Sequence, residues 1–87
     1  MSLRGADIDQ LVTLNQTFSE KGGQVESVTA QISSVLGATN WSGPGADKFR
    51  DQWNGEFVPA LNRLREALGE AGSAVESRRQ AIEAATA

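Results

Sequence analysis

A seven-residue repeat of apolar side chains in the first half of the chain constrains its fold more than any other feature. The repeat consists of two rows offset by three positions: Leu11, Phe18, Val25 and Ile32 in the first, and Leu14, Val28 and Val35 in the second. Lys21 is the only interruption of the second row. Apolar residues at this spacing are typical of one helix that packs along a seam. We expect that helix from about residue 7 to about residue 38.

The second half carries a similar pattern after a clear break. Residues 39–45, with the sequence TNWSGPG, are rich in turn formers, and Pro44 suits the first position of a following helix. The apolar positions then recur every three or four residues: Phe49, Trp53, Phe57, Leu61, Leu64, Leu68, Ala71, Val75 and Ile82. We expect one helix from about residue 45 to 84, kinked near Pro59 because an interior proline removes a backbone hydrogen bond. A complete break at Pro59 is the alternative.

Two positions in the first helix leave alternatives open. The pair Gly22-Gly23 costs about 2 kcal/mol relative to two alanines. We favour a soft spot or slight bend there over the close approach of another backbone. Lys21 is expected to bury its stem and keep its amine in water, and an ion pair with a partner is the alternative.

Two long helices joined by a short turn form an antiparallel hairpin. Such a rod is one helix thick and encloses no closed core, so its apolar stripes need a second polypeptide. We therefore expect an all-α fold, a single domain over residues 1–87, in which two hairpins pair into a four-helix bundle dimer. The bundle core and dimer interface are expected to comprise the heptad residues named above with Phe49, Trp53, Phe57, Leu61, Leu64, Leu68, Val75 and Ile82. Trp53 is expected near the seam between the two hairpins.

Charge and hydropathy argue against nucleic-acid and membrane partners. The net charge is -3; residues 1–40 carry four acids against two bases, and residues 41–87 carry seven against six. Nucleic-acid binders need a basic face, and interfacial helices need a basic polar side. No window of the sequence is apolar enough to span a bilayer. We expect neither nucleic-acid binding nor stable membrane insertion.

The chain also lacks the residues on which most catalytic and metal sites depend. It contains no Cys, His or Tyr. Histidine is the commonest general base and metal ligand, and cysteine is the only side chain with a thiol. Arg78 and Arg79 with Glu76 and Glu83 have ordinary i,i+3 and i,i+4 spacings and are expected on a solvated helix face. The same is expected of Arg63, Arg65, Glu66 and Glu70. We expect no enzyme activity, no metal and no cofactor.

The turn carries the most specific motif. Trp41-x-Gly43 lies between two amphipathic helices near the middle of the chain and is followed by Ala46-x-x-Phe49-x-x-x-Trp53. This arrangement resembles the WXG family, the ESAT-like proteins of about a hundred residues exported by type VII (ESX) secretion systems of actinobacteria and Gram-positive bacteria. The resemblance covers nearly the whole chain. It implies a helical hairpin that pairs with itself or a related WXG subunit, and export of the folded dimer by a membrane-bound ATPase.

One part of the family pattern is missing. In the family, the turn of one subunit lies beside the partner's tail, which carries a Tyr-x-x-x-Asp/Glu secretion signal; this chain has no Tyr. Only Trp41 and Gly43 carry over as the secretion motif. We interpret this as favouring a heterodimer whose other subunit supplies the tail, with trimming of this copy as the alternative. The N-terminus resembles no signal peptide. We expect synthesis in the cytoplasm followed by secretion or surface display, and the alternative function is a cytosolic adaptor without export.

Overall fold

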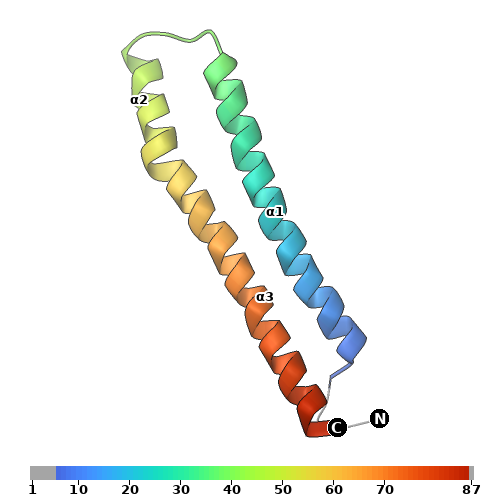
Figure 1. Cartoon of the computed structure of the whole chain (residues 1–87). Coiled ribbons are helices and arrows are strands. Elements are labelled where there is room, and N and C mark those ends of the chain that lie inside the picture. Colours follow the sequence, from blue (N-terminus) through green and yellow to red (C-terminus); the bar gives the residue numbers. More distant parts are fainter. Residues whose placement is uncertain (1–5, 87) are drawn as a thin grey trace.

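The computed structural model describes residues 6–86, which form an antiparallel helical hairpin (Figure 1). Helix α1 spans Ile8–Ala38, and the return arm consists of α2 (Pro44–Gln52), a π-helical turn η1 (Trp53–Phe57) and α3 (Val58–Thr86). The arms lie side by side, joined at one end by residues 39–43, and the whole measures 64 × 17 × 16 Å. The expected all-α hairpin is confirmed.

Helix α1 has well-defined ends. The side chain of Asp7 accepts a hydrogen bond from the backbone N–H of Gln10 at 3.1 Å and so caps the first turn. At the other end, the backbone N–H of Thr39 donates to the carbonyl of Leu36. The helix is continuous through Gly22 and Gly23.

The return arm is irregular before Pro59 rather than at it. The backbone N–H of Val58 donates to the carbonyl of Trp53, five residues back, which defines the π-helical turn. A π-helical turn inserts one extra residue into a helix and displaces the backbone bonds around it. It therefore accommodates the missing N–H of Pro59 without ending the helix. The expected kink near Pro59 takes this form, and the alternative of a complete break is wrong.

Side chains that face the other arm form what we call the hairpin seam. Among the described residues the buried apolar side chains are Ala46 and Trp53, and no large side chain is fully buried. The other seam side chains are half-buried. The seam consists of Leu11, Asn15, Phe18, Gly22, Val25, Thr29 and Leu36 on α1, and Ala46, Arg50, Trp53, Leu61, Arg65, Leu68, Gly72, Val75, Arg79 and Ile82 on the return arm.

Two buried glycines, Gly22 and Gly72, lie against the other arm. A Cβ placed on Gly22 would lie 3.8 Å from the carbonyl oxygen of Arg65, and one on Gly72 would lie 3.0 Å from Oδ1 of Asn15 and 3.3 Å from Cβ of Phe18. At Gly22 the backbone of Arg65 lies within ordinary van der Waals contact of such a Cβ, which favours the alternative, the approach of another backbone. Gly23 has no neighbour within 4 Å of such a Cβ.

Candidate protein-interaction surface

Arg50 holds the turn that carries the Trp-x-Gly motif. Its Nη1 donates to the carbonyl of Trp41 at 2.7 Å, and its Nη2 donates to the carbonyl of Thr39 at 3.1 Å. The guanidinium carbon lies 5.9 Å from the centre of the Trp41 ring, within cation–π range. The rings of Phe49 and Trp41 also pack together at a tilt, with centroids 5.7 Å apart. Trp41 is thus held in place while remaining 44% exposed.

Gly43 has a backbone conformation that only glycine adopts readily. Its φ is 107° and its ψ is 177°, a region closed to residues with a Cβ. Its carbonyl accepts the first hydrogen bond of α2, from the backbone N–H of Asp47 at 3.0 Å, and Pro44 follows at the first helical position. The motif has a glycine at this position because the chain changes direction there with a backbone conformation that other residues rarely adopt.

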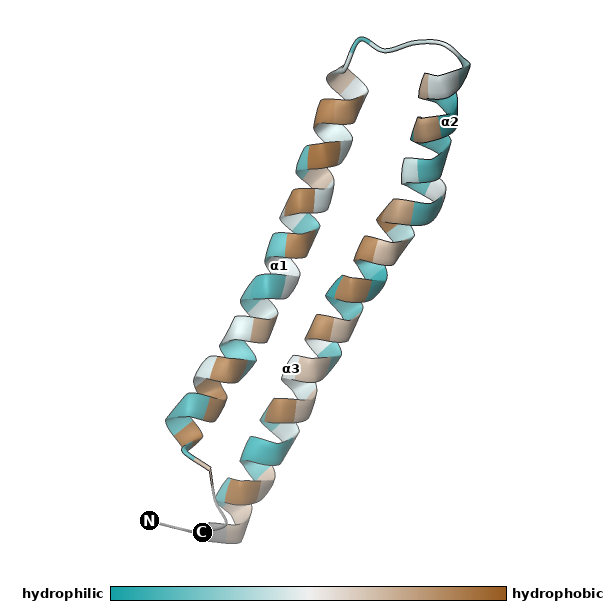
Figure 2. Ribbon diagram, turned by 180° about the vertical axis from the view of Figure 1, so that it is seen from behind, coloured by the Kyte–Doolittle hydropathy of each residue, from teal (hydrophilic) through white to brown (hydrophobic). Residues whose placement is uncertain are grey.

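A row of apolar side chains on each arm is left uncovered by the hairpin. Figure 2 shows apolar segments recurring turn after turn along both arms. We call the exposed rows the apolar face. It consists of Leu14, Lys21, Val28, Ile32 and Val35 from α1, and Phe49, Phe57, Leu64, Ala71 and Arg78 from the return arm. Ala71 is half-buried and the others are exposed.

The two rows lie on the same side of the hairpin. On α1, Leu14 and Val28 each precede a seam residue by one position; on α3, Leu64 and Ala71 do the same. One step along a helix is a rotation of about 100° in a fixed sense. On antiparallel helices that face each other, a displacement by one residue toward the N-terminus points to the same side. The hairpin therefore has one continuous apolar face.

The apolar face tapers along its length. Its end near the turn carries bulky side chains, including Phe49 and Phe57, and a shallow groove of about 520 Å³ between Ile32, Val35 and Trp41. Along α3 its outer edge is formed by exposed alanines seven residues apart: Ala60, Ala67, Ala74 and Ala81. Small residues let another helix approach closely, so this edge suits helix packing.

The opposite side of the hairpin is polar and is crossed by hydrogen bonds. Nε1 of Trp53 donates to Oγ of Ser33 at 3.0 Å, and Nη1 of Arg65 lies 3.3 Å from Oε2 of Glu26. These contacts join the arms and fix which sides face each other. The Arg65–Glu26 pair is exposed, so it contributes little to stability.

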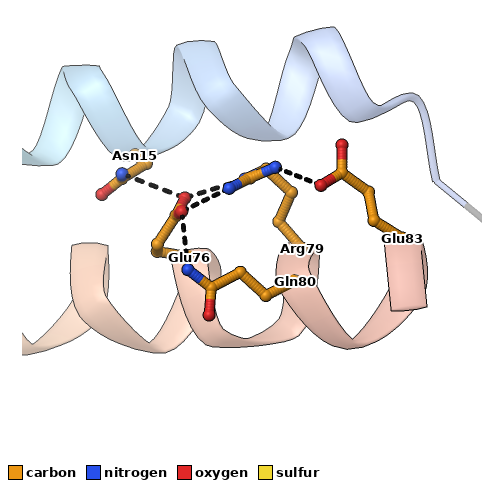
Figure 3. A network of polar contacts seen from close by, with 5 residues as sticks. All are labelled: Asn15, Glu76, Arg79, Gln80 and Glu83. Carbon is orange, nitrogen blue, oxygen red and sulfur yellow. Dashed lines mark hydrogen bonds and ion pairs between the residues drawn. The ribbon is translucent and has the colours of Figure 1, made fainter. Parts of the chain in front are cut away.

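A second polar contact lies near the open end (Figure 3). Arg79 bridges two carboxylates of its own helix: its Nε donates to Oε2 of Glu76 at 2.9 Å and its Nη1 to Oε2 of Glu83 at 2.6 Å. Nδ2 of Asn15 on α1 donates to the same Glu76 oxygen at 3.5 Å. The Arg79 side chain is only 18% exposed, so the expectation of a solvated face is wrong for Arg79, while Arg78 and Glu83 are exposed.

This network shifts the protonation equilibria of its members. The hydrogen bond from Arg79 holds the pKa of the Glu76 carboxyl below its ordinary value, with the charge of Arg79 and a bond from Gln80 acting in the same direction. The bond to Glu76 raises the pKa of Arg79 further above its ordinary value. Both residues therefore stay charged at neutral pH.

The structure divides the residues expected in a common core and interface into two groups. Ile32, although in the first heptad row, joins Leu14, Val28 and Val35 in being exposed. Trp53 lies inside the single hairpin, at 7% exposed, rather than at a seam between two hairpins. The group on the hairpin seam is Leu11, Phe18, Val25, Trp53, Leu61, Leu68, Val75 and Ile82; the group on the apolar face is Leu14, Val28, Ile32, Val35, Phe49, Phe57 and Leu64.

Several residues that shape the surface were missed from sequence. Arg50 has no periodic relation to the carbonyls it binds, so no local pattern identifies it. Gly72 and Arg79 do carry a signal, because with Arg65 they form a heptad row of their own on the seam. That row contains no large apolar residue, which is why apolar periodicity passes over it.

Within residues 6–86 no cluster of three or more potential ligands is placed to hold a metal ion. Nor does that part of the chain contain a helix both long and apolar enough to cross a bilayer.

The fold and surface define a helical hairpin with one uncovered apolar face and an exposed, braced tryptophan at its turn. No protein-family model, curated protein or solved structure matches this chain.

Proposed function

We propose that this chain is an ESAT-like protein of the WXG family, exported as a folded homo- or heterodimer by a type VII secretion system and acting through protein–protein contact. The observation that carries the proposal is the apolar face, which runs the length of a hairpin whose turn presents Trp41-x-Gly43. In this proposal the protein is not an enzyme and needs no cofactor.

The exposed area supports pairing. The chain exposes 6418 Å². A compact monomer of its 9.2 kDa mass exposes about 4,900 Å², so the excess is about 1,500 Å². A typical stable interface buries about 800 Å² on each partner. Covering the apolar face with a second hairpin would remove enough area for such an interface and complete a four-helix bundle.

Trp41 is proposed to contact the secretion ATPase. Its indole is exposed yet restrained by Arg50 and Phe49, so binding it costs little ordering entropy. Aromatic side chains held this way are typical anchors of protein interfaces. Gly43 contributes by setting the direction of the turn.

Co-expression with the product of a neighbouring small gene, followed by light scattering, tests pairing. We expect a folded dimer; a stable, folded monomer of this chain alone at micromolar concentration contradicts the proposal. Export is tested by comparing Trp41→Ala with Asn40→Ala, an exposed neighbour in the same turn, in a host with an active type VII system. Trp41→Ala should still form the dimer, because the rest of the apolar face is unchanged, but it should stay in the cell. Asn40→Ala should be exported.

Confinement of the wild type to the cytosol while that system exports its other substrates would favour the alternative, a cytosolic helical adaptor. Unchanged export of Trp41→Ala would remove the proposed role of the turn.

A further inference from the structure

The guanidinium of Arg50 binds the turn rather than a carboxylate. Its Nη1 donates to the carbonyl of Trp41 at 2.7 Å and its Nη2 to the carbonyl of Thr39 at 3.1 Å. Arg50 is half-buried and takes part in none of the ion pairs among the described residues. A planar guanidinium presents its donors in a fixed fork, which suits two acceptors at once. Two hydrogen bonds from one rigid group therefore fix the turn relative to α2.

The backbone of the turn has few other contacts that hold it. The N–H of Trp41 donates to the carbonyl of Thr39 at 2.9 Å, the same oxygen that Nη2 of Arg50 binds. Among the described residues, Arg50 is the one whose side chain donates to the backbone of residues 39–43. With both the N–H and the carbonyl of Trp41 bonded, Arg50 fixes the backbone from which the indole projects.

The ring of Trp41 is held by the same residue that holds its backbone. The guanidinium carbon of Arg50 lies 5.9 Å from the ring centre, and Phe49, the preceding residue of α2, packs against the ring. On the side of α1, the indole forms one wall of the shallow groove with Ile32 and Val35. The exposed part of the indole is therefore presented in one orientation.

We propose that Arg50 is the positioning residue for Trp41, and that export depends on its guanidinium as well as on the Trp-x-Gly motif. The inference rests on the proposed function and names a further residue of the docking site, one that acts through the indole without touching the secretion ATPase. A partner that binds an indole already held in one orientation does not have to order it. Without Arg50 the indole is ordered only on binding, and the affinity falls.

A purely structural role for Arg50 is the competing explanation, and lysine separates the two. Helix α1 has no basic residue in its last turn, so a cation from α2 near its C-terminal carbonyls stabilises the helix through its dipole. Lysine supplies this charge, but its ammonium on a flexible stem does not bind two carbonyls in a fixed fork or stack on a ring as a guanidinium does. Arg50→Lys should therefore unfold at nearly the wild-type temperature and still lose the positioning.

Side-chain NMR of the full chain labelled with nitrogen-15 tests the positioning directly. The chain has two tryptophans, and the Nε1 signal of Trp41 is the one lost in Trp41→Ala. The order parameter of this indole should be close to that of rigid backbone in wild type, about 0.85, and below about 0.6 in Arg50→Lys and Arg50→Ala. The buried Trp53 should stay rigid in every variant. Lys48→Ala, which removes an exposed cation from the same helix, is the matched control and should behave as wild type. A Trp41 indole as ordered in the Arg50 variants as in wild type contradicts the inference.

Export measures the consequence of this positioning. In a host with an active type VII system, the secreted fraction of Arg50→Lys should be about two- to tenfold lower than that of Lys48→Ala, the factor expected when one more side chain must be ordered on binding. Retention of Trp41→Ala together with full export of Arg50→Lys would overturn the role of Arg50 in export and leave the proposed function standing. Export of Trp41→Ala, or no export of the wild type, would overturn the proposed function itself, and the order parameters would still decide whether Arg50 positions the indole.

Discussion

The indole of Trp53 crosses the hairpin to reach Ser33, with Nε1 donating to Oγ at 3.0 Å. Trp53 belongs to the π-helical turn and Ser33 to the last third of α1, so one hydrogen bond ties the irregular part of the return arm to the straight arm. The ring is also one of the few buried side chains of the described hairpin. This contact fixes the rotation of the return arm near the turn.

Removing either partner of this hydrogen bond should lower the free energy of unfolding, and the two effects should not be additive. Ser33→Ala should lower the free energy of unfolding by about 1 kcal/mol, and Trp53→Ala by about 3–5 kcal/mol because ring packing is lost as well. Trp53→Phe keeps an aromatic ring without the donor. A double-mutant cycle of Ser33→Ala with Trp53→Phe, measured by chemical denaturation, should show non-additivity; fully additive effects would mean that the bond contributes nothing. The exposed neighbour Ser34→Ala is the control.

Replacing glycine by alanine should change the stability differently at Gly23 of α1 and at Gly72 of α3. Gly23→Ala faces open space and should stabilise the protein by about 1 kcal/mol through helix propensity. Gly72→Ala would place its Cβ 3.0 Å from Oδ1 of Asn15 and 3.3 Å from Cβ of Phe18, so these neighbours must shift by a few tenths of an ångström and the gain is cancelled or reversed. Thermal unfolding followed by circular dichroism separates them. A Gly72→Ala variant as stable as Gly23→Ala would show that the arms do not approach closely there.

Gly43→Ala should cost about 1–3 kcal/mol, because its positive φ is strained for alanine. No atom lies within 4 Å of the added Cβ, so the whole cost comes from the backbone. Gly45→Ala, two residues along and inside α2, is the matched control and should be neutral or stabilising. Equal stabilities of the two variants would be inconsistent with the turn geometry described above.

Glu76 should make stability depend on acid pH. Because Arg79 holds its folded-state pKa below the ordinary value, the ionised carboxylate stabilises the fold above the unfolded-state pKa, and this contribution is lost as the pH falls through the folded pKa. The stability difference between wild type and Glu76→Gln should therefore shrink below about pH 4.5. Melting curves of both proteins from neutral pH to about pH 3, a span that includes the titration of Asp and Glu side chains, measure this difference in stability. In an Arg79→Gln background the same substitution should show a weaker pH dependence; parallel curves in both backgrounds would refute the linkage.

The periodicity of the sequence predicts the helices of this fold. Apolar residues three and four apart predict two long helices, and the glycines and proline of residues 39–45 predict the turn between them. The short turn makes the arms antiparallel. The π-helical turn itself was not predicted: the pattern indicated a kink near Pro59, and the irregularity lies just before that residue, at Trp53–Phe57.

Only the tertiary structure decided which apolar row of each arm faces the other arm. Periodicity marks Leu11 and Leu14 alike as members of a stripe, yet one faces α3 and the other solvent. Small residues contribute to this choice: Gly72 packs directly against Asn15 and Phe18, where a Cβ would be crowded. Leu14, Val28 and Leu64, each one position before a seam residue, are exposed. A hydropathy pattern does not mark a row that contains glycine, because glycine allows close packing by having no side chain. Helix content, length and the position of the turn were therefore determined by the sequence pattern, and the apolar face was determined by how closely the arms pack.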